Sequence, residues 1–268
     1  MLHGIGRSLD DWTEQHDLLD HDHRIISLDL PGFGSTPPIA TGMGLQSLAD
    51  AAVATLDAPG EKRPVHIVGN SLGGAIAMTV HARHPGRVRS LSLKSSAGFG
   101  AEVTPALRII SLNGLGPWLL ARNSRISARR VERSLYADPS LATEARVDLA
   151  LELAAIPGRA ASFRKALLSI GGIRGTKPKW RADLLRNMLA DPVPTLIMWG
   201  ERDVVLPLVH LAAAAEALPH ARTVMLPTTG HMAQAEQPDE VSRLITELWR
   251  SCDELGGPDT LSAQWRSG

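Results

Sequence analysis

Hydrophobic positions along the chain follow two spacings. Short apolar runs predict strands, and apolar residues three or four positions apart predict helices. The predicted strands cover residues 25–28, 65–68, 88–93, 194–200 and 223–226. The predicted helices cover residues 9–19, 45–56, a segment after Ser71 that stops before Pro85, 208–217 and 239–249. The strands are too apolar to face water, which predicts an α/β fold with a mostly parallel central sheet flanked by helices.

The pattern changes between residues 99 and 190. Helical spacing recurs there with no convincing strand between the helices, at residues 105–121, 128–136, 140–155, 160–170 and 181–189. We therefore expect an all-helical cap inserted before the last strands of the sheet. The expected divisions are a first core part at 1–98, the cap at 99–190, a second core part at 191–252 and a flexible tail at 253–268.

Composition narrows the class of protein. The 268 residues suit one large α/β domain, and the formal net charge of zero gives no general attraction to nucleic acid or to acidic membranes. The single cysteine, Cys252, cannot form an internal disulfide, and no apolar run approaches the length of a membrane-spanning helix. The first residues lack the apolar segment of a signal peptide. We expect a cytoplasmic protein without stable membrane insertion, and its oligomeric state is left open.

The most informative stretch is the pattern Gly-x-Ser-x-Gly at residues 69–73, centred on Ser71. An apolar strand precedes it, and small residues compatible with a helix follow it. A serine on such a tight strand-to-helix turn has a strained backbone, and glycine on both sides avoids a steric collision. The turn also directs the first amides of the helix at one point, so the N–H of Leu72 can stabilise an oxyanion.

A serine nucleophile needs a base, and the base needs an acid that orients it. In open α/β sheets these groups come from loops at the carboxyl ends of strands. Of the ten histidines, only His231 lies just after a late strand. The same rule selects Asp203 as the acid, in the loop after the strand at 194–200. Glu201 and Asp191 are the alternative acids. No pattern predicts a cofactor or a metal ion.

These motifs together resemble the α/β-hydrolase superfamily. The catalytic order Ser71, Asp203, His231 is that of the family, and further landmarks occur in the family's order between His3 and Trp249. They are His3-Gly4, the segment Asp29 to Gly34, Gly200-Glu201-Arg202-Asp203, and Gly230-His231 followed by Glu236-Gln237-Pro238. The resemblance implies that the second oxyanion donor is the N–H of Ile5. It also implies that the inserted helices are the family's cap domain.

Serine at the nucleophile position argues against haloalkane dehalogenases and epoxide hydrolases, which the resemblance associates with aspartate. Asn70 and the pair Gly73-Gly74 are similar to the carbon–carbon bond hydrolases of aromatic breakdown. The loop at residues 4–7 lacks the fuller glycine- and proline-rich sequence of those enzymes. We therefore expect a serine hydrolase that cleaves a small-molecule ester or thioester through an acyl-enzyme. A carbon–carbon bond hydrolase, an acyltransferase and a non-catalytic binding protein of this fold remain alternatives.

The cap is basic. Residues 101–190 hold 15 Lys and Arg against 7 Asp and Glu. Two interpretations remain open: these arginines solvate exposed helix faces, or they attract an anionic small-molecule substrate.

The start of the chain also differs from the start expected for the family that it resembles. Only Met1 and Leu2 precede His3, whereas the family's His-Gly loop follows an interior strand. That strand would separate the strand at 25–28 from the strand at 65–68, so we expect translation to begin upstream of Met1.

Overall fold

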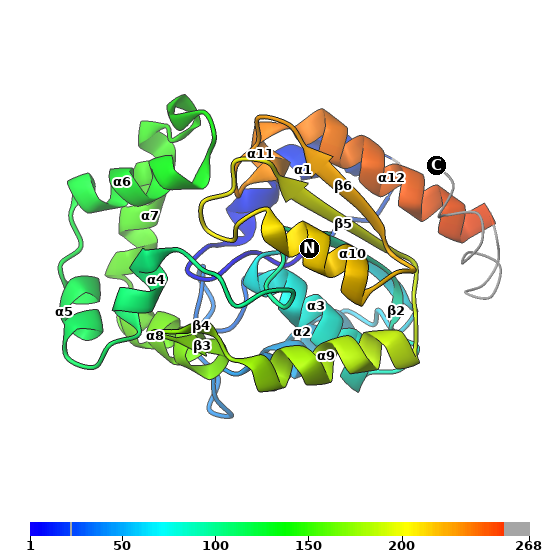
Figure 1. The fold of residues 1–268 in the computed structure, drawn as a ribbon, viewed down its shortest axis with the longest axis horizontal. Helices are drawn as coiled ribbons and strands as arrows, with labels where there is room; N and C mark the ends of the chain where they lie inside the picture. The colour runs from blue at the N-terminus through cyan, green and yellow to red at the C-terminus, as the bar shows by residue number, and fades with distance from the viewer. Residues whose placement is uncertain (22, 255–268) are drawn as a thin grey trace.

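The computed structural model describes residues 1–21 and 23–254. Its centre is a four-stranded parallel sheet in the order β1-β2-β5-β6 (Figure 1). The strands are β1 (Val65–Asn70), β2 (Val88–Lys94), β5 (Thr195–Gly200) and β6 (Arg222–Leu226). Alternate residues of β1 enter opposite cores, Ile67 on one face and Val68 on the other. The predicted parallel sheet and α/β class are confirmed.

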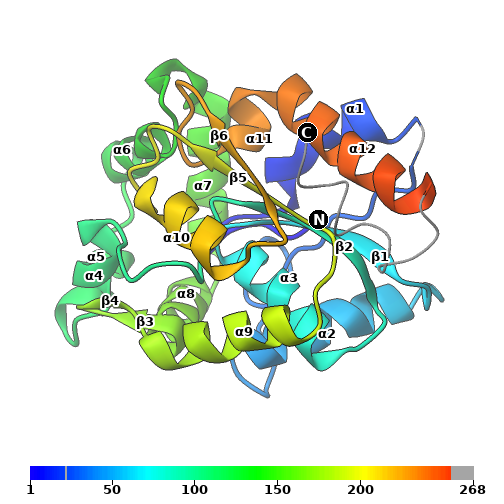
Figure 2. The same ribbon diagram turned by 45° about the vertical axis from the view of Figure 1, so that its right-hand side comes forward.

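Helices cover both faces of the sheet, as Figure 2 also shows. On one face, the short helix η1 (Leu9–Trp12), α1 (Thr13–Leu19) and α12 (Pro238–Glu254) bury apolar side chains against the strands. On the other face, α2 (Leu45–Asp57), α3 (Leu72–Arg83), α9 (Pro178–Ala190) and α10 (Val209–Ala217) contribute to the larger core. Helix α3 is buried along most of its length, which explains why its sequence is small and apolar rather than amphipathic.

The chain between β2 and β5 is mostly helical and extends away from the sheet (Figure 1). Its helices are α4 (Pro105–Ile110), α5 (Leu115–Ala121), α6 (Arg125–Leu135), η2 (Pro139–Leu141), α7 (Glu144–Ala155), α8 (Arg159–Ile170) and α9. Helix α9 differs from the others because it packs against α3 beside the sheet. The segment that stands over the carboxyl ends of the strands therefore comprises the helices before α9.

Two predictions about the helical segment were wrong. Residues 105–121 form two helices instead of one, because Gly114 between them has a φ of 78° that breaks the helix. The segment also contains a small antiparallel hairpin, β3 (Gly171–Gly172) and β4 (Gly175–Thr176), where no strand was expected. Two-residue strands give no periodic signal, so sequence periodicity could not reveal this hairpin.

The predicted strand at 25–28 was wrong. Leu28 forms only an isolated parallel bridge, to Leu2, and Leu2 forms a second parallel bridge to Gly69. Leu2 thus lies between residues 25–28 and β1, the position expected for an interior strand. Within the described residues, no ladder extends along 25–27, and a groove of about 460 Å³ separates this segment from β1.

The carboxyl-terminal prediction was partly wrong. Helix α12 continues through Asp253 and Glu254, two residues of the predicted flexible tail. The rest of that tail, residues 255–268, lies outside the described residues. Before α12, the four-residue helix α11 (Ala233–Glu236) follows the loop that carries His231.

Candidate active site

Ser71 lies at the sharp turn between β1 and α3. Its φ of 54° and ψ of −116° are strained for a residue with a side chain. The Ser71 N–H donates to the carbonyl of Lys94 (3.0 Å), and the Ser71 carbonyl accepts from Ala97 (3.0 Å). These bonds attach the turn to the end of β2 and maintain the strained conformation that presents the hydroxyl.

Both glycines of the motif are required by close backbone contacts. A Cβ on Gly69 would lie 2.5 Å from the carbonyl oxygen of Gly73. A Cβ on Gly73 would lie 2.1 Å from the carbonyl oxygen of Leu2. The steric reason predicted for these two glycines is confirmed, and the second contact comes from the amino-terminal segment.

Asp203 and His231 are brought together from the loops after β5 and β6. The Nδ1 of His231 lies 2.8 Å from Oδ2 of Asp203, and both side chains are buried. The other oxygen, Oδ1, accepts the N–H groups of Val205 (2.8 Å) and Leu206 (2.9 Å). With Nδ1–H donating to the carboxylate, Nε2 of the neutral imidazole is free to accept a proton.

The electrostatics of this pair favour an ionised acid. Burial would raise the pKa of Asp203, but the facing His231 and the N–H of Leu206 outweigh it and hold that pKa below its usual value. Asp203 therefore stays negative at neutral pH and can stabilise an imidazolium when one forms.

The alternative acids occupy other positions. The Glu201 carboxylate accepts the N–H of Thr228 (2.9 Å) and is exposed. Asp191 follows the end of α9, and Nε2 of His81 lies 2.6 Å from its carbonyl oxygen and 3.6 Å from its Oδ2. These two carboxylates therefore do not replace Asp203 beside His231.

Asn70 attaches the histidine loop to the nucleophile turn. Its Nδ2 donates to the carbonyl of His231 (3.2 Å).

The loop at residues 3–6 lies against the serine turn. His3 is fully buried; its Nδ1 donates to the Gly4 carbonyl (2.7 Å), and its Nε2 accepts the N–H of Leu30 (3.0 Å). Burial lowers the pKa of His3, which keeps this bridging imidazole neutral. A Cβ on Gly4 would lie 3.4 Å from Cβ of Ser71, so the loop brings the Ile5 backbone close to the nucleophile.

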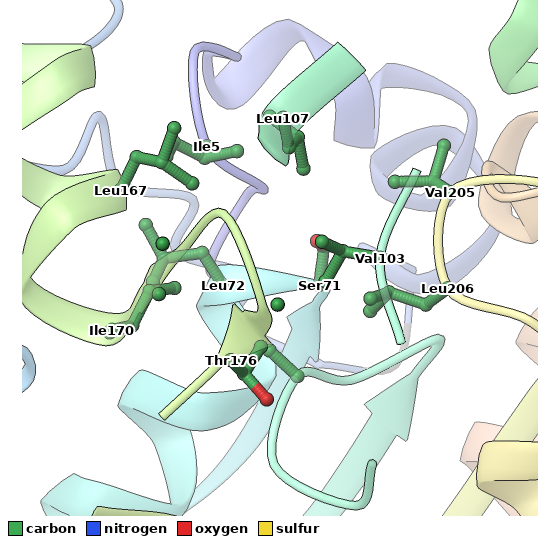
Figure 3. A pocket seen from close by; sticks show the side chains of 14 residues that line it. Ile5, Ser71, Leu72, Val103, Leu107, Leu167, Ile170, Thr176, Val205 and Leu206 are labelled. Carbon is green, nitrogen blue, oxygen red and sulfur yellow. The ribbon is translucent and has the colours of Figure 1, made fainter. Parts of the chain in front are cut away.

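A narrow pocket of about 30 Å³ opens beside Ser71 (Figure 3). Ile5 and Leu72, the residues expected to supply the oxyanion donors, line it with Ser71. The remaining wall is formed by apolar side chains, glycines and one threonine: Ala97, Val103, Leu107, Leu167, Ile170, Gly171, Gly172, Gly175, Thr176, Val205 and Leu206. The Thr176 hydroxyl donates to the carbonyl of Gly100 (2.7 Å), so it already has a partner in the protein. No charged side chain belongs to this lining among the described residues.

Sequence reasoning missed Asn70 as a link to His231, and it missed the hairpin that contributes Thr176 to the pocket. The asparagine stood inside the serine motif, but nothing in the motif indicates where its amide reaches. The glycines at 171–175 marked a helix break and gave no further signal.

Comparison with known proteins identifies the family. The family model described as alpha/beta hydrolase fold matches residues 1–238. The chain belongs to this family. Its likeness to solved structures agrees: a meta-cleavage product hydrolase from Pseudomonas fluorescens IP01, solved as a mutant with acetates, is 26% identical with a TM-score of 0.77. That comparison covers 93% of this chain and 89% of the other.

The curated relatives of this chain have several activities. The acetyltransferase component of an acetoin cleaving system from Pseudomonas putida is 31% identical over 93% of this chain, and the chain spans 62% of that relative's length. A 2-hydroxy-6-oxononadienedioate/2-hydroxy-6-oxononatrienedioate hydrolase from Pseudomonas sp. is 29% identical, covering 91% of this chain and 85% of the relative. Lipase 1 from Psychrobacter immobilis is 27% identical, and the match covers 90% of this chain and 73% of the lipase. The chain thus belongs to the α/β-hydrolase family, as the motifs predicted. No helix in the described part of the chain has the length and apolarity needed to cross a bilayer.

Proposed function

We propose that this α/β hydrolase cleaves a small-molecule carboxylic ester or thioester through an acyl-enzyme. The observation that carries the proposal is the buried Asp203–His231 pair, in the loops that follow β5 and β6 of the sheet whose strand β1 leads into the Ser71 turn. Ser71 would be the nucleophile, His231 the general base and then acid, and Asp203 the group that fixes the imidazole tautomer.

The reaction follows from these roles. The Ser71 oxygen attacks the acyl carbon while His231 Nε2 takes the hydroxyl proton, and the N–H groups of Ile5 and Leu72 stabilise the oxyanion. The imidazolium returns its proton to the departing alcohol or thiol. A water molecule, deprotonated by His231, then attacks the acyl-enzyme, and the acid is released with Ser71 restored.

The pocket supports an apolar acyl group as the bound part of the substrate. Its side chains are aliphatic apart from Ser71 and Thr176, and among the described residues no cationic side chain lines it to pair with a carboxylate. The basic residues of the helical segment are partly engaged elsewhere: Arg125 pairs with Glu144 and Asp148, and Arg159 donates to the carbonyl of Gly34. These contacts count against the interpretation in which the arginines attract an anionic substrate and favour the one in which they cover exposed helix faces.

A carbon–carbon bond hydrolase is the second candidate. It is supported by the likeness to the meta-cleavage product hydrolase and to the hydrolase from Pseudomonas sp.. Acyl transfer to an acceptor other than water would use the same triad, and the acetyltransferase relative supports it. The alternative that is not an enzyme is a binding protein of this fold that uses the pocket without catalysis. The cytoplasmic location and the absence of a nucleic-acid partner stay predictions from the sequence.

A substrate panel tests the proposal. We expect turnover of p-nitrophenyl esters or acyl thioesters and labelling of Ser71 by a fluorophosphonate probe. Ser71→Ala and His231→Ala should each lower kcat by about 10³-fold or more. Turnover of a vinylogous diketone acid alone would favour the carbon–carbon class, and product yield that rises with an added thiol acceptor would favour acyl transfer. Full turnover by purified Ser71→Ala would refute the assignment of the nucleophile.

A further inference from the structure

The Glu236 carboxylate joins two parts of the chain that are far apart in sequence. Its Oε1 accepts the N–H of Gly230 (2.7 Å), directly before His231. Its Oε2 accepts the N–H of Ala137 (2.8 Å), just beyond the end of α6 in the helical segment. One half-buried carboxylate therefore connects the histidine loop to residues 135–137, here called the cap root.

Two further contacts show how closely these backbones approach. The N–H of His231 donates to the carbonyl of Leu135 (2.8 Å). A Cβ on Gly230 would lie 2.7 Å from the nitrogen of Ala137 and 2.8 Å from the oxygen of Leu135. On its other side, the His231 carbonyl accepts from Asn70. The backbone of His231 is thus held between the nucleophile turn and the cap root.

We propose that Glu236 is a positioning residue, which fastens the cap root to the histidine loop and so fixes the His231 imidazole relative to the Ser71 hydroxyl. The proposal rests on the hydrolase function proposed above. A shift of the cap root would displace His231, so the active geometry depends on how this part of the cap is seated.

An ionised carboxylate suits this role because it has two acceptor oxygens for two N–H donors. The isosteric glutamine has one acceptor oxygen and one NH₂ group, so Glu236→Gln leaves one backbone N–H facing another donor. Burial raises the pKa of Glu236 against the opposing effect of the Ala137 and Gly230 N–H groups. The Glu236→Gln substitution removes the cost of burying a charged group. This gain in folding free energy partly offsets the loss of one hydrogen bond.

Glu201→Gln is a matched control. Glu201 also accepts a backbone N–H of the same loop, that of Thr228 (2.9 Å), but it is exposed and makes this contact away from the cap root. Ala137→Pro is a second test variant, because it removes the cap-root donor and leaves Glu236 and Gly230 unchanged. The extended backbone of Tyr136, with φ of −113° and ψ of 146°, suits a residue before proline.

The experiment measures kcat and KM on a p-nitrophenyl ester, with amide hydrogen exchange at Ala137. A misplaced catalytic group lowers the rate by up to about 10²-fold, so we expect Glu236→Gln to lower kcat about 10- to 100-fold with KM within about threefold. Amide exchange at Ala137 should accelerate in the same variant. Glu201→Gln should keep both parameters within about twofold of the wild type.

Unchanged kcat in Glu236→Gln despite faster exchange at Ala137 would overturn the proposal, as would equal losses in Glu236→Gln and Glu201→Gln. If Glu236→Gln fails to fold, Ala137→Pro decides: lowered kcat supports the proposal and unchanged kcat overturns it. A wild type that hydrolyses no substrate counts against the proposed function instead. The positioning role is then judged by the low-field NMR signal of the His231 Nδ1 proton. That signal should shift in Glu236→Gln and not in Glu201→Gln, and an unshifted signal overturns the proposal.

Discussion

The side-chain amide of Asn70 donates to the backbone carbonyl of His231 across 161 positions of sequence (3.2 Å). The same amide also donates to the carbonyl of Lys94 (3.3 Å), so one buried group connects the nucleophile turn, β2 and the histidine loop. The residue beside the proposed nucleophile thereby holds the proposed base.

Asn70→Ala should impair catalysis and stability together. It removes the Asn70 donor from the buried His231 carbonyl, which costs about 1–3 kcal/mol of unfolding free energy and loosens the His231 backbone, whereas the Lys94 carbonyl still accepts the Ser71 N–H. We expect kcat to fall about tenfold or more, because misplacement of a catalytic group by an ångström can cost up to about 100-fold. Denaturant unfolding and steady-state kinetics check both effects. A variant that loses stability but keeps kcat would show that Asn70 only supports the fold.

Asp203→Asn should lower kcat by about 10²- to 10⁴-fold while the fold persists. The amide can face His231 with its NH₂ group, which favours the tautomer with the proton on Nε2 and removes the base needed by Ser71. Kinetics on the ester that the wild type turns over best give the measurement. Glu201→Asn provides the comparison, and a similar loss in both variants would leave the acid unassigned.

Ile170→Ala should widen the pocket beside Ser71, because Ile170 is buried in its wall. A hydrophobic pocket discriminates by about 1–3 kcal/mol per methylene, so the ratio of kcat/KM for a longer ester to that for acetate should rise about tenfold or more. The cavity should also cost about 2–5 kcal/mol of stability. Ile173→Ala, at an exposed position, is the control. An unchanged chain-length profile would place the acyl group elsewhere.

Salt dependence tests the charge of the helical segment. Because no charged side chain lines the described pocket and several arginines are paired, we expect kcat/KM to depend on ionic strength equally for an anionic ester and its neutral analogue. Initial rates between low and moderate salt give the comparison. A steeper fall for the anionic ester would show that the basic segment attracts anionic substrates.

His66 should make stability sensitive to acid. Burial lowers its pKa from 6.5 to about 4. As pH falls from 7 to 4, the unfolded chain takes up this proton before the folded chain does, so the unfolding free energy decreases by up to about 3 kcal/mol. His66→Gln should remove about this part of the pH dependence, measured by urea unfolding at both pH values. Exposed His21→Gln is the control. An unaltered pH dependence in His66→Gln would contradict the prediction.

Local sequence determined the proposed nucleophile and most of the sheet. The collision that excludes side chains at Gly69 arises within the turn itself, from Gly73, so the short motif already contains its cause. Buried parallel strands require continuous apolar runs, which are visible in the sequence. The rule that catalytic groups follow the carboxyl ends of strands then narrowed the choice to Asp203 and His231.

Tertiary structure decided what depends on contacts between distant segments. Periodicity suggested a strand at 25–28, but a strand needs a partner, and within residues 1–21 and 23–254 the bridges to this segment are limited to the one between Leu28 and Leu2. Spacing could not show that Glu236 reaches Ala137, because 99 positions separate them and the bond exists only once the cap root lies against the histidine loop. The sequence thus determined which chemical groups are available, since local sterics and apolar runs act over a few residues. Packing alone decided which distant backbone segments hold those groups in place.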